Sequence, residues 1–210
     1  MKRISVLTIG LAMIAAVPVE AQLFNFPNYA VPTGAPATFI GAGYGTGLND
    51  ASGKLDAYGA AVGRTGIGNR ATVAASLGMI DSAPDSEWTF GGLVGFDVLP
   101  AGGSAQVTLQ AGVGHMSPGD LTFLQFPIGV ALKGLMEGPT ANVEPWVMPR
   151  LHYSRVSANG SSASSTDFGV SGGFSVTLPS GLGVHTALDL TAVDPDNVWM
   201  LGVGLHYMIP

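Results

Sequence analysis

The sequence alternates between apolar and small side chains with a period of two residues, and this alternation recurs along most of the chain. It is strictest near the C-terminus, where every second residue from Trp199 to Tyr207 is large and apolar. The residues between them are Met200, Gly202, Gly204 and His206. A period of two is that of a β-strand whose two faces meet different surroundings. The chain is therefore predicted to be all β.

About ten segments of this kind can be delimited. Each is close to the roughly 9 to 11 residues that a tilted strand needs to cross a bilayer. The predicted strands are 38–47, 55–65, 70–80, 87–98, 104–116, 121–134, 142–156, 167–178, 182–192 and 198–208. Eight strands, with two of the segments misassigned, is the alternative.

The two faces of these segments favour a transmembrane barrel over a soluble β-sandwich. Large apolar residues occupy one face of 88–98, 124–132 and 168–178, whereas Gly, Ala, Ser and Thr dominate the other. A solvated sandwich face would carry Lys and Glu, but charged residues make up only 10% of the chain. After residue 22 no apolar run approaches the roughly 18 to 20 residues of a membrane helix. A closed antiparallel up-and-down β-barrel is the other way to satisfy the backbone in lipid.

The N-terminus indicates export. Lys2 and Arg3 precede the apolar stretch 4–17, and Ala21 is a suitable small residue before a cut. Residues 1–21 are predicted to be a signal peptide and 22–37 a proline-rich extension, with the barrel in 38–210. A membrane anchor retained in the mature protein is the alternative.

The connections are predicted to alternate between tight turns and longer polar loops. The tight turns are 66–69, 101–103, 138–140 and 179–181, and the longer loops are 48–54, 81–86, 117–120, 157–166 and 193–197. Outer-membrane barrels have short turns on one side and longer loops on the outer side. Loops 81–86 and 157–166 are therefore expected to face the cell exterior, and the serines in 161–165 are read as a flexible loop.

The last segment resembles the small bacterial outer-membrane β-barrel superfamily. Gly202, Leu205 and Tyr207 match the C-terminal signal of such barrels, which is a glycine, an apolar residue three positions on and an aromatic two further. Met208, Ile209 and Pro210 follow that aromatic, whereas the family usually ends on it. The resemblance implies export, contact with the barrel-assembly machinery, and residence among the lipids and lipopolysaccharide of the outer membrane. It implies no particular activity.

Ionisable residues on the predicted inner face are the natural candidates for function. They are Asp97, Lys133, Glu144, Arg150, His152, His185, Asp189 and His206. A network of paired charges that fills the barrel is favoured, because barrels of this size are usually filled by side chains. A constriction that selects small solutes is the alternative. Inward small residues such as Gly204 should accept Ser, whereas Arg at lipid-facing Val203 should disrupt insertion.

Chemistry at these residues is not expected. His185 and Asp189 lie four residues apart on one strand, roughly 13 Å at the usual rise, which is too far for direct contact. No cysteine is present, and neither a metal nor a cofactor is expected. The net charge of -6 argues against a nucleic-acid partner. A non-enzymatic structural or surface-interaction role is favoured; a narrow passive pore and a rim enzyme acting on lipid or peptide are the alternatives.

Overall fold

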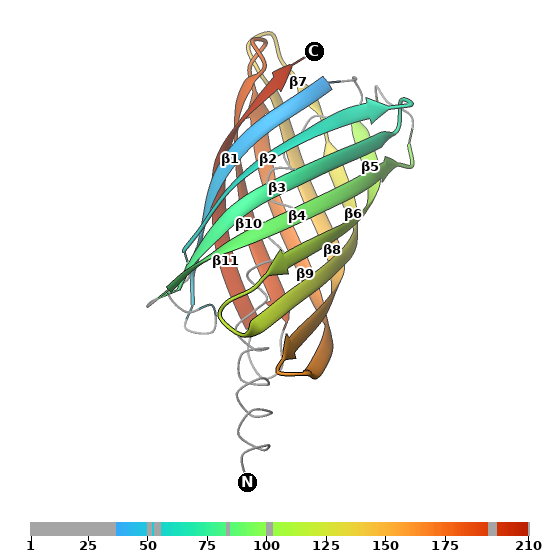
Figure 1. The fold of residues 1–210 in the computed structure, drawn as a ribbon. Coiled ribbons are helices and arrows are strands. Elements are labelled where there is room, and N and C mark those ends of the chain that lie inside the picture. The colour runs from blue at the N-terminus through green and yellow to red at the C-terminus, as the bar shows by residue number, and fades with distance from the viewer. Residues whose placement is uncertain are drawn as a thin grey trace.

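The computed structural model describes residues 37–49, 52, 56–82, 85–99, 103–192 and 197–209. Within these ranges the chain forms an antiparallel β-barrel (Figure 1). The predicted signal peptide and proline-rich extension lie outside the described residues. The strands are β1 (Ala37–Gly47), β2 (Asp56–Ile67), β3 (Ala71–Ser82), β4 (Asp85–Asp97), β5 (Ala105–Met116), β6 (Leu121–Gly134), β7 (Met136–Glu137), β8 (Asn142–Ala158), β9 (Ser161–Thr177), β10 (Leu182–Ala192) and β11 (Asn197–Ile209).

Pairing between the first and last strands closes the barrel. Thr38 of β1 lies opposite Ile209 of β11, and β6 pairs directly with β8, so that ten long strands form a ring. The two-residue strand β7 pairs only with the start of β8. We call the end that holds Ala37 and Ile209 the terminal end and the opposite end the hairpin end. The predicted ten-stranded barrel is confirmed. No helix among the described residues is long and apolar enough to cross a membrane.

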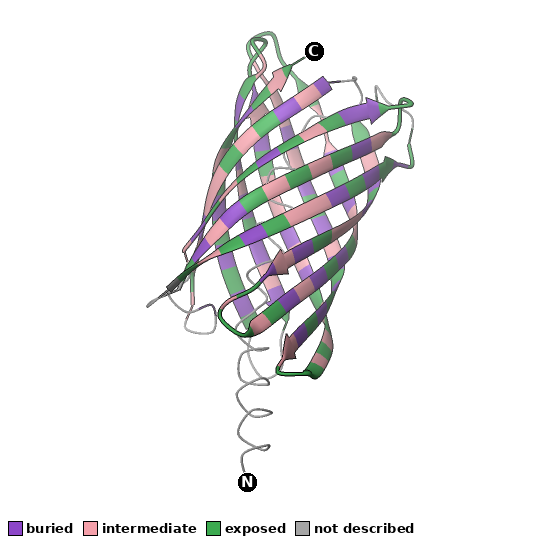
Figure 2. Cartoon of the chain, in the orientation of Figure 1, coloured by how far each residue is buried: buried purple, intermediate pink, exposed green. Residues whose placement is uncertain are grey.

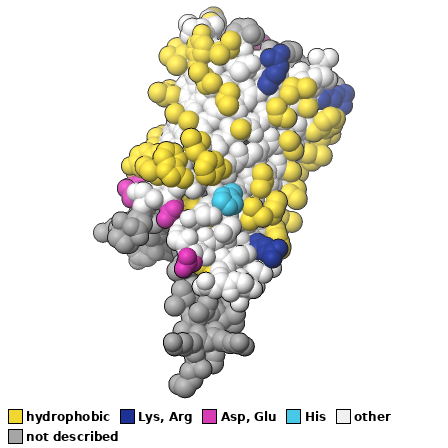
Figure 3. Space-filling view, viewed as in Figure 1, with side chains coloured by type: hydrophobic (Ala, Val, Ile, Leu, Met, Phe, Trp, Pro, Cys, Tyr) yellow, Lys and Arg dark blue, Asp and Glu magenta, His cyan; other side chains and the backbone are white. Residues whose placement is uncertain are grey.

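The outer wall is apolar, because the large apolar residue at every second position of a strand points outward. Along each strand in Figure 2, exposed residues alternate with less exposed ones. Hydrophobic side chains cover much of the outer wall in Figure 3. Ile128 and Trp88, for example, are 62% and 58% exposed. A soluble protein rarely leaves so large an apolar surface open, whereas a barrel in lipid requires it.

Aromatic side chains collect on the outer wall toward the hairpin end. The rings of Tyr44 and Tyr58 are tilted against each other with centroids 5.3 Å apart, and those of Phe126 and Tyr153 have centroids 6.2 Å apart. Exposed Trp88, Phe90, Phe168 and Trp199 are on other strands at this end. Such a ring of aromatics is typical of the boundary between lipid and water.

The lumen is filled partly by apolar side chains. One buried cluster lies toward the hairpin end and contains Ala57, Ile80, Met116, Phe123 and Val156. A second pairs Phe39 with Ala61 at the terminal end, and a third contains Ala131, Trp146, Met148 and Ala187. Phe39 needs the glycine opposite it, because a Cβ at Gly63 would collide with the edge of the Phe39 ring. The inner face is therefore less uniformly small than the sequence pattern indicates.

The tight turns predicted at 66–69 and 179–181 are present, but the predicted long loops 81–86 and 157–166 are wrong. Segment 157–166 is not a flexible loop: β8 and β9 continue through it as paired strands, joined by Asn159 and Gly160. Both turn residues have positive φ, 48° and 79°, as a two-residue hairpin turn requires. Segment 81–86 likewise belongs mostly to β3 and β4. At the opposite end, seven residues separate β4 from β5. These parts of the strands lie outside the lipid and have no alternating apolar residues, so the sequence pattern there is that of a loop.

Candidate functional site

All eight ionisable residues singled out on the inner face lie inside the barrel. None of them is more than 6% exposed. They come from five strands, which are β4, β6, β8, β10 and β11, and they fall into three groups. The first surrounds Arg150, the second contains Asp97, Lys133 and Glu144, and the third is the pair His185 and His206.

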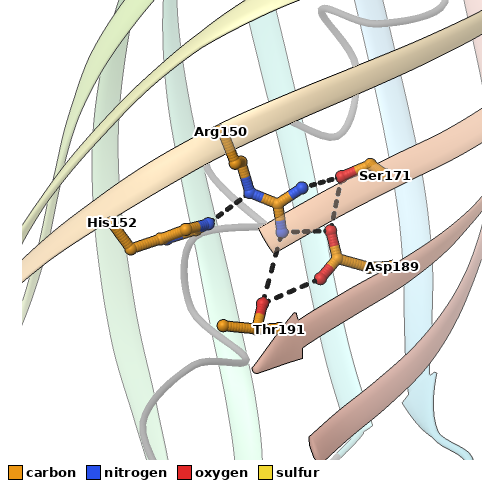
Figure 4. A network of polar contacts seen from close by, with 5 residues as sticks. All are labelled: Arg150, His152, Ser171, Asp189 and Thr191. Carbon is orange, nitrogen blue, oxygen red and sulfur yellow. Dashed lines mark hydrogen bonds and ion pairs between the residues drawn. The ribbon is translucent and has the colours of Figure 1, made fainter. Parts of the chain in front are cut away.

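The Arg150 network crosses three neighbouring strands (Figure 4). The guanidinium of Arg150 on β8 donates to Ser171 on β9 and to the carboxylate of Asp189 on β10, with which it forms an ion pair. It also donates to the imidazole of His152 on its own strand. Ser171 donates to the same Asp189 carboxylate at 2.5 Å, and Thr191 donates to its other oxygen at 3.3 Å.

Glycines make room for this arginine on both sides of β8. Gly129 lies opposite Arg150 on β6, and a Cβ there would stand 2.8 Å from the Arg150 Cβ. Gly169 lies opposite on β9, where a Cβ would stand 3.2 Å from the guanidinium. The long side chain of Arg150 therefore fits in the lumen because the residues opposite it, Gly129 and Gly169, have no side chains. A buried charge is tolerated only when it is paired and hydrogen-bonded, and Arg150 has both.

The second group lies toward the terminal end. Thr108 of β5 donates to the Asp97 carboxylate at 2.7 Å, and both side chains are buried. Lys133 lies within electrostatic range of both Glu144 and Asp97. Because one cation faces two carboxylates from neighbouring parts of the wall, this group also consists of mutually compensating charges.

The third group brings two histidines together. Nδ1 of His185 lies 3.3 Å from Nδ1 of His206, and the ring centroids are 5.6 Å apart. Nε2 of His206 lies 2.9 Å from the Thr177 hydroxyl. Asp189 is not part of this group, because its carboxylate is taken by Arg150. His185 and Asp189, which the sequence predicts to be too far apart for contact, thus belong to two different networks. No group of three or more His, Asp or Glu side chains that could hold a metal occurs among the described residues.

The expectation that Gly204 accepts Ser is contradicted by this packing. The His185 ring lies over Gly204, and a Cβ there would stand 2.6 Å from the carbonyl oxygen of Ala42. The other ring is seated in the same way, because His206 lies over Gly183. Gly45 is also buried on the inner face, but a Cβ there would meet nothing closer than 3.7 Å.

Polar residues outside the lumen do not assemble into a comparable cluster in the part of the chain that the structure describes. His115 lies on the outer face and is 3.3 Å from the Ser117 hydroxyl. Tyr44 donates to Asp56 at 2.6 Å, and Ser86 donates to Asp81 at 3.1 Å. These contacts are those of ordinary surface hydrogen bonds.

Sequence reasoning missed the uncharged members of the networks. Ser171, Thr191 and Thr177 are buried and bond to charged or histidine side chains. Ser171 and Thr177 stand on the face of β9 that the alternation assigns to the lumen, so a complete survey of inward hydroxyls would have found them. Trp146, also buried inside, follows from the alternation of β8 in the same way.

Comparison with known proteins adds similarity in shape alone. No protein-family model matches the chain, and no curated protein does. The N-terminal β-barrel domain of Pseudomonas aeruginosa OprF is similar at 12% identity, with a TM-score of 0.42 over 82% of this chain and 97% of that one. The translocator domain of the autotransporter NalP from Neisseria meningitidis has 13% identity and a TM-score of 0.46 over 95% and 96%.

A third similar structure is the outer membrane protein Ail of Yersinia pestis, at 10% identity, with a TM-score of 0.41 over 83% of this chain and all of that one. The assignment of this chain rests on its own architecture, because a closed barrel with an apolar outer belt is how strands satisfy their backbone in lipid. Ten long strands in a closed ring, an apolar belt and an aromatic girdle are the architecture of a transmembrane β-barrel.

Proposed function

We propose that this protein is a non-enzymatic barrel whose lumen is closed by its own side chains and whose role is structural or in surface interaction. The observation that carries the proposal is the buried network around Arg150, which ties β8, β9 and β10 together across the lumen face. In a water-filled pore such charges would be hydrated and exposed, whereas Arg150, Ser171 and Asp189 are buried and bonded to one another.

Apolar clusters on both sides of the polar networks support the same reading. The cluster around Phe123 lies toward the hairpin end, and Phe39 packs at the terminal end. Apolar side chains packed together leave little path for a hydrated ion. The outer wall would then contact lipid and lipopolysaccharide, and the polar parts beyond the belt would meet other molecules.

Solute flux into liposomes tests this proposal. Purified protein reconstituted into liposomes should give no swelling in small sugars beyond that of protein-free liposomes. A porin of the outer membrane in the same lipid serves as the positive control. Swelling at the rate of the porin control would contradict a closed lumen, and hydrolysis of a lipid or peptide by the purified barrel would contradict a non-enzymatic role.

A narrow passive pore is the second candidate, because ionisable and hydroxyl groups extend along much of the inner wall from Asp97 to Asp189. Such a pore would pass ions but no sugars. Small conductance steps that disappear when the histidines are protonated would favour it over the closed barrel.

A further inference from the structure

The hairpin formed by the ends of β8 and β9 extends beyond the apolar belt. Outward-facing residues on β8 change from Leu151 and Tyr153 to Arg155, and β9 has no apolar outward residue before Phe168. In Figure 1 this hairpin projects from the lower end of the barrel. Its tip therefore stands in water rather than in lipid.

One edge of the projecting hairpin is unpaired. β9 pairs with β8 along its whole length, from Ser161 to Thr177. Its other neighbour, β10, ends at Ala192 opposite Phe168. Among the described residues, no strand pairs with this second side of Ser161–Asp167. The free edge is seven residues of β9, roughly 20 Å long at the usual rise.

Two hydrogen-bonded positions establish which backbone groups of β9 point away from β8, toward the unpaired side. The two-residue turn at Asn159 and Gly160 makes Ala158 and Ser161 a hydrogen-bonded pair, so odd-numbered residues of β9 bond to β8. At the other end of β9, Leu178 N donates to Leu182 O at 2.8 Å, so even-numbered residues bond toward β10. Both observations give the same result. The free edge presents the N–H and C=O groups of Ser162, Ser164 and Thr166.

This edge carries none of the usual features that prevent pairing. Natural proteins protect exposed edge strands with Lys, Pro, a bulge or a covering segment. Residues 161–166 contain neither charge nor proline, and the register with β8 is unbroken. Ser162, Ser164 and Thr166 are all exposed. Their short hydroxyl side chains allow close approach of another strand and hydrogen bonds across it.

The charge around the edge specifies the kind of strand that fits. Asp167 lies at the base of the edge, and Asp81 and Asp120 are exposed at the same end of the barrel. Arg155 is the one basic residue at this end within the described ranges. Arg155 donates to the Ser162 hydroxyl at 3.4 Å, so positive charge lies at the tip of the edge and negative charge at its base, at Asp167. The base of the edge therefore favours an incoming segment with Lys or Arg.

We propose that the free edge of β9, residues 161–167, binds an extended basic segment of a partner protein, which adds to the barrel sheet as a further strand. Main-chain hydrogen bonds to Ser162, Ser164 and Thr166 provide the affinity, and Asp167 selects positive charge. The inference rests on the proposed surface-interaction role and names the part of the surface that performs it.

The test uses full-length protein in nanodiscs and two synthetic peptides. One is a nine-residue peptide of alternating Thr and Lys, and the other is the same peptide N-methylated at every residue, which keeps the charge but has no backbone donors. The unmethylated peptide should bind with at least 10-fold higher affinity than the methylated one. Equal binding of both peptides would overturn the proposal, because it would show attraction to the acidic rim alone.

Substitutions at Ser164 separate pairing from folding. S164P removes an outward N–H and should lower the affinity for the Thr–Lys peptide at least 10-fold. Proline is tolerated at an edge position whose N–H faces solvent, so the barrel should still fold. S164A keeps the backbone donor and should bind within 2-fold of the unchanged protein. Equal affinities of S164P and S164A would contradict the proposed edge.

Two further outcomes are distinguishable. One is dimerisation of the protein in the absence of peptide. If S164P abolishes that dimerisation, the edge binds a second copy of the chain and the proposal is overturned. Sugar flux through the barrel is measured separately in liposomes. Failure of the closed-lumen function would therefore leave the peptide-binding result to stand or fall independently.

Discussion

Arg150 and Asp189 form a buried ion pair that spans β9, since one residue belongs to β8 and the other to β10. Ser171, on the strand between them, hydrogen-bonds to both. The arrangement links three strands through one guanidinium. Its energetic consequence is asymmetric, because loss of one charge leaves the other buried without compensation.

Removal of one member of the ion pair should therefore be strongly destabilising. Asp189→Ala is expected to lower the free energy of unfolding by about 3 to 5 kcal/mol. The double variant Arg150→Met with Asp189→Leu should lose much less, because no charge remains in the lumen. Urea unfolding in detergent micelles or lipid vesicles measures both. Equal losses in the single and double variants would contradict a compensated buried pair.

The packing of the His185 ring against Gly204 gives a second prediction. Gly204→Ser should destabilise the barrel by about 1 to 3 kcal/mol, the usual cost of overpacking, because its Cβ would meet His185 and the Ala42 carbonyl. Gly45→Ser, also on the inner face, should change stability by less than about 0.5 kcal/mol. Thermal gel-shift midpoints of the two variants test this. Similar midpoints would mean that His185 does not lie over Gly204.

The lipid-facing register of β11 gives a third prediction. Val203 is exposed on the outer wall between Leu201 and Leu205. Val203→Arg should cost about 2 to 4 kcal/mol near the bilayer midplane and lower the yield of refolding into vesicles. Val203→Leu is the matched control and should refold normally. Undiminished yield with arginine would place Val203 away from lipid.

The orientation of the barrel remains a prediction, with the hairpin end outside the cell. Because the chain has no cysteine, single substitutions give a clean label. Ser162→Cys should react with a membrane-impermeant maleimide on intact cells, whereas Arg70→Cys, exposed near the opposite end, should react only after the outer membrane is permeabilised. The reverse pattern of labelling would show that the hairpin end faces the periplasm.

The sequence predicts the strands and their faces well wherever one face meets lipid. Segments 121–134 and 182–192 coincide with β6 and β10, and the apolar residues of 88–98 lie on the outer wall. The prediction fails where the strands leave the membrane. Residues 161–166 of β9 have water on both faces, so nothing selects an apolar alternation there. The Asn159–Gly160 dipeptide was the available signal, since it favours a two-residue hairpin.

The contacts within the lumen could be predicted only in part. Alternation identifies Arg150, Asp189 and His206 as inward residues, but which of them meet depends on the stagger of the strands around the ring. That stagger brings Ser171 opposite Asp189. It also places His185 over Gly204, which is why a glycine that looks replaceable in the sequence is required by the structure.

Single-channel recording in planar bilayers tests the closed lumen most directly. The unchanged protein should show no large, stable conductance. A variant with Arg150→Ala and Asp189→Ala, which removes the ion pair that ties β8 to β10, should show small steps under the same conditions. Reproducible steps of porin size from the unchanged protein, no larger in the double variant, would contradict the proposal that these side chains close the barrel.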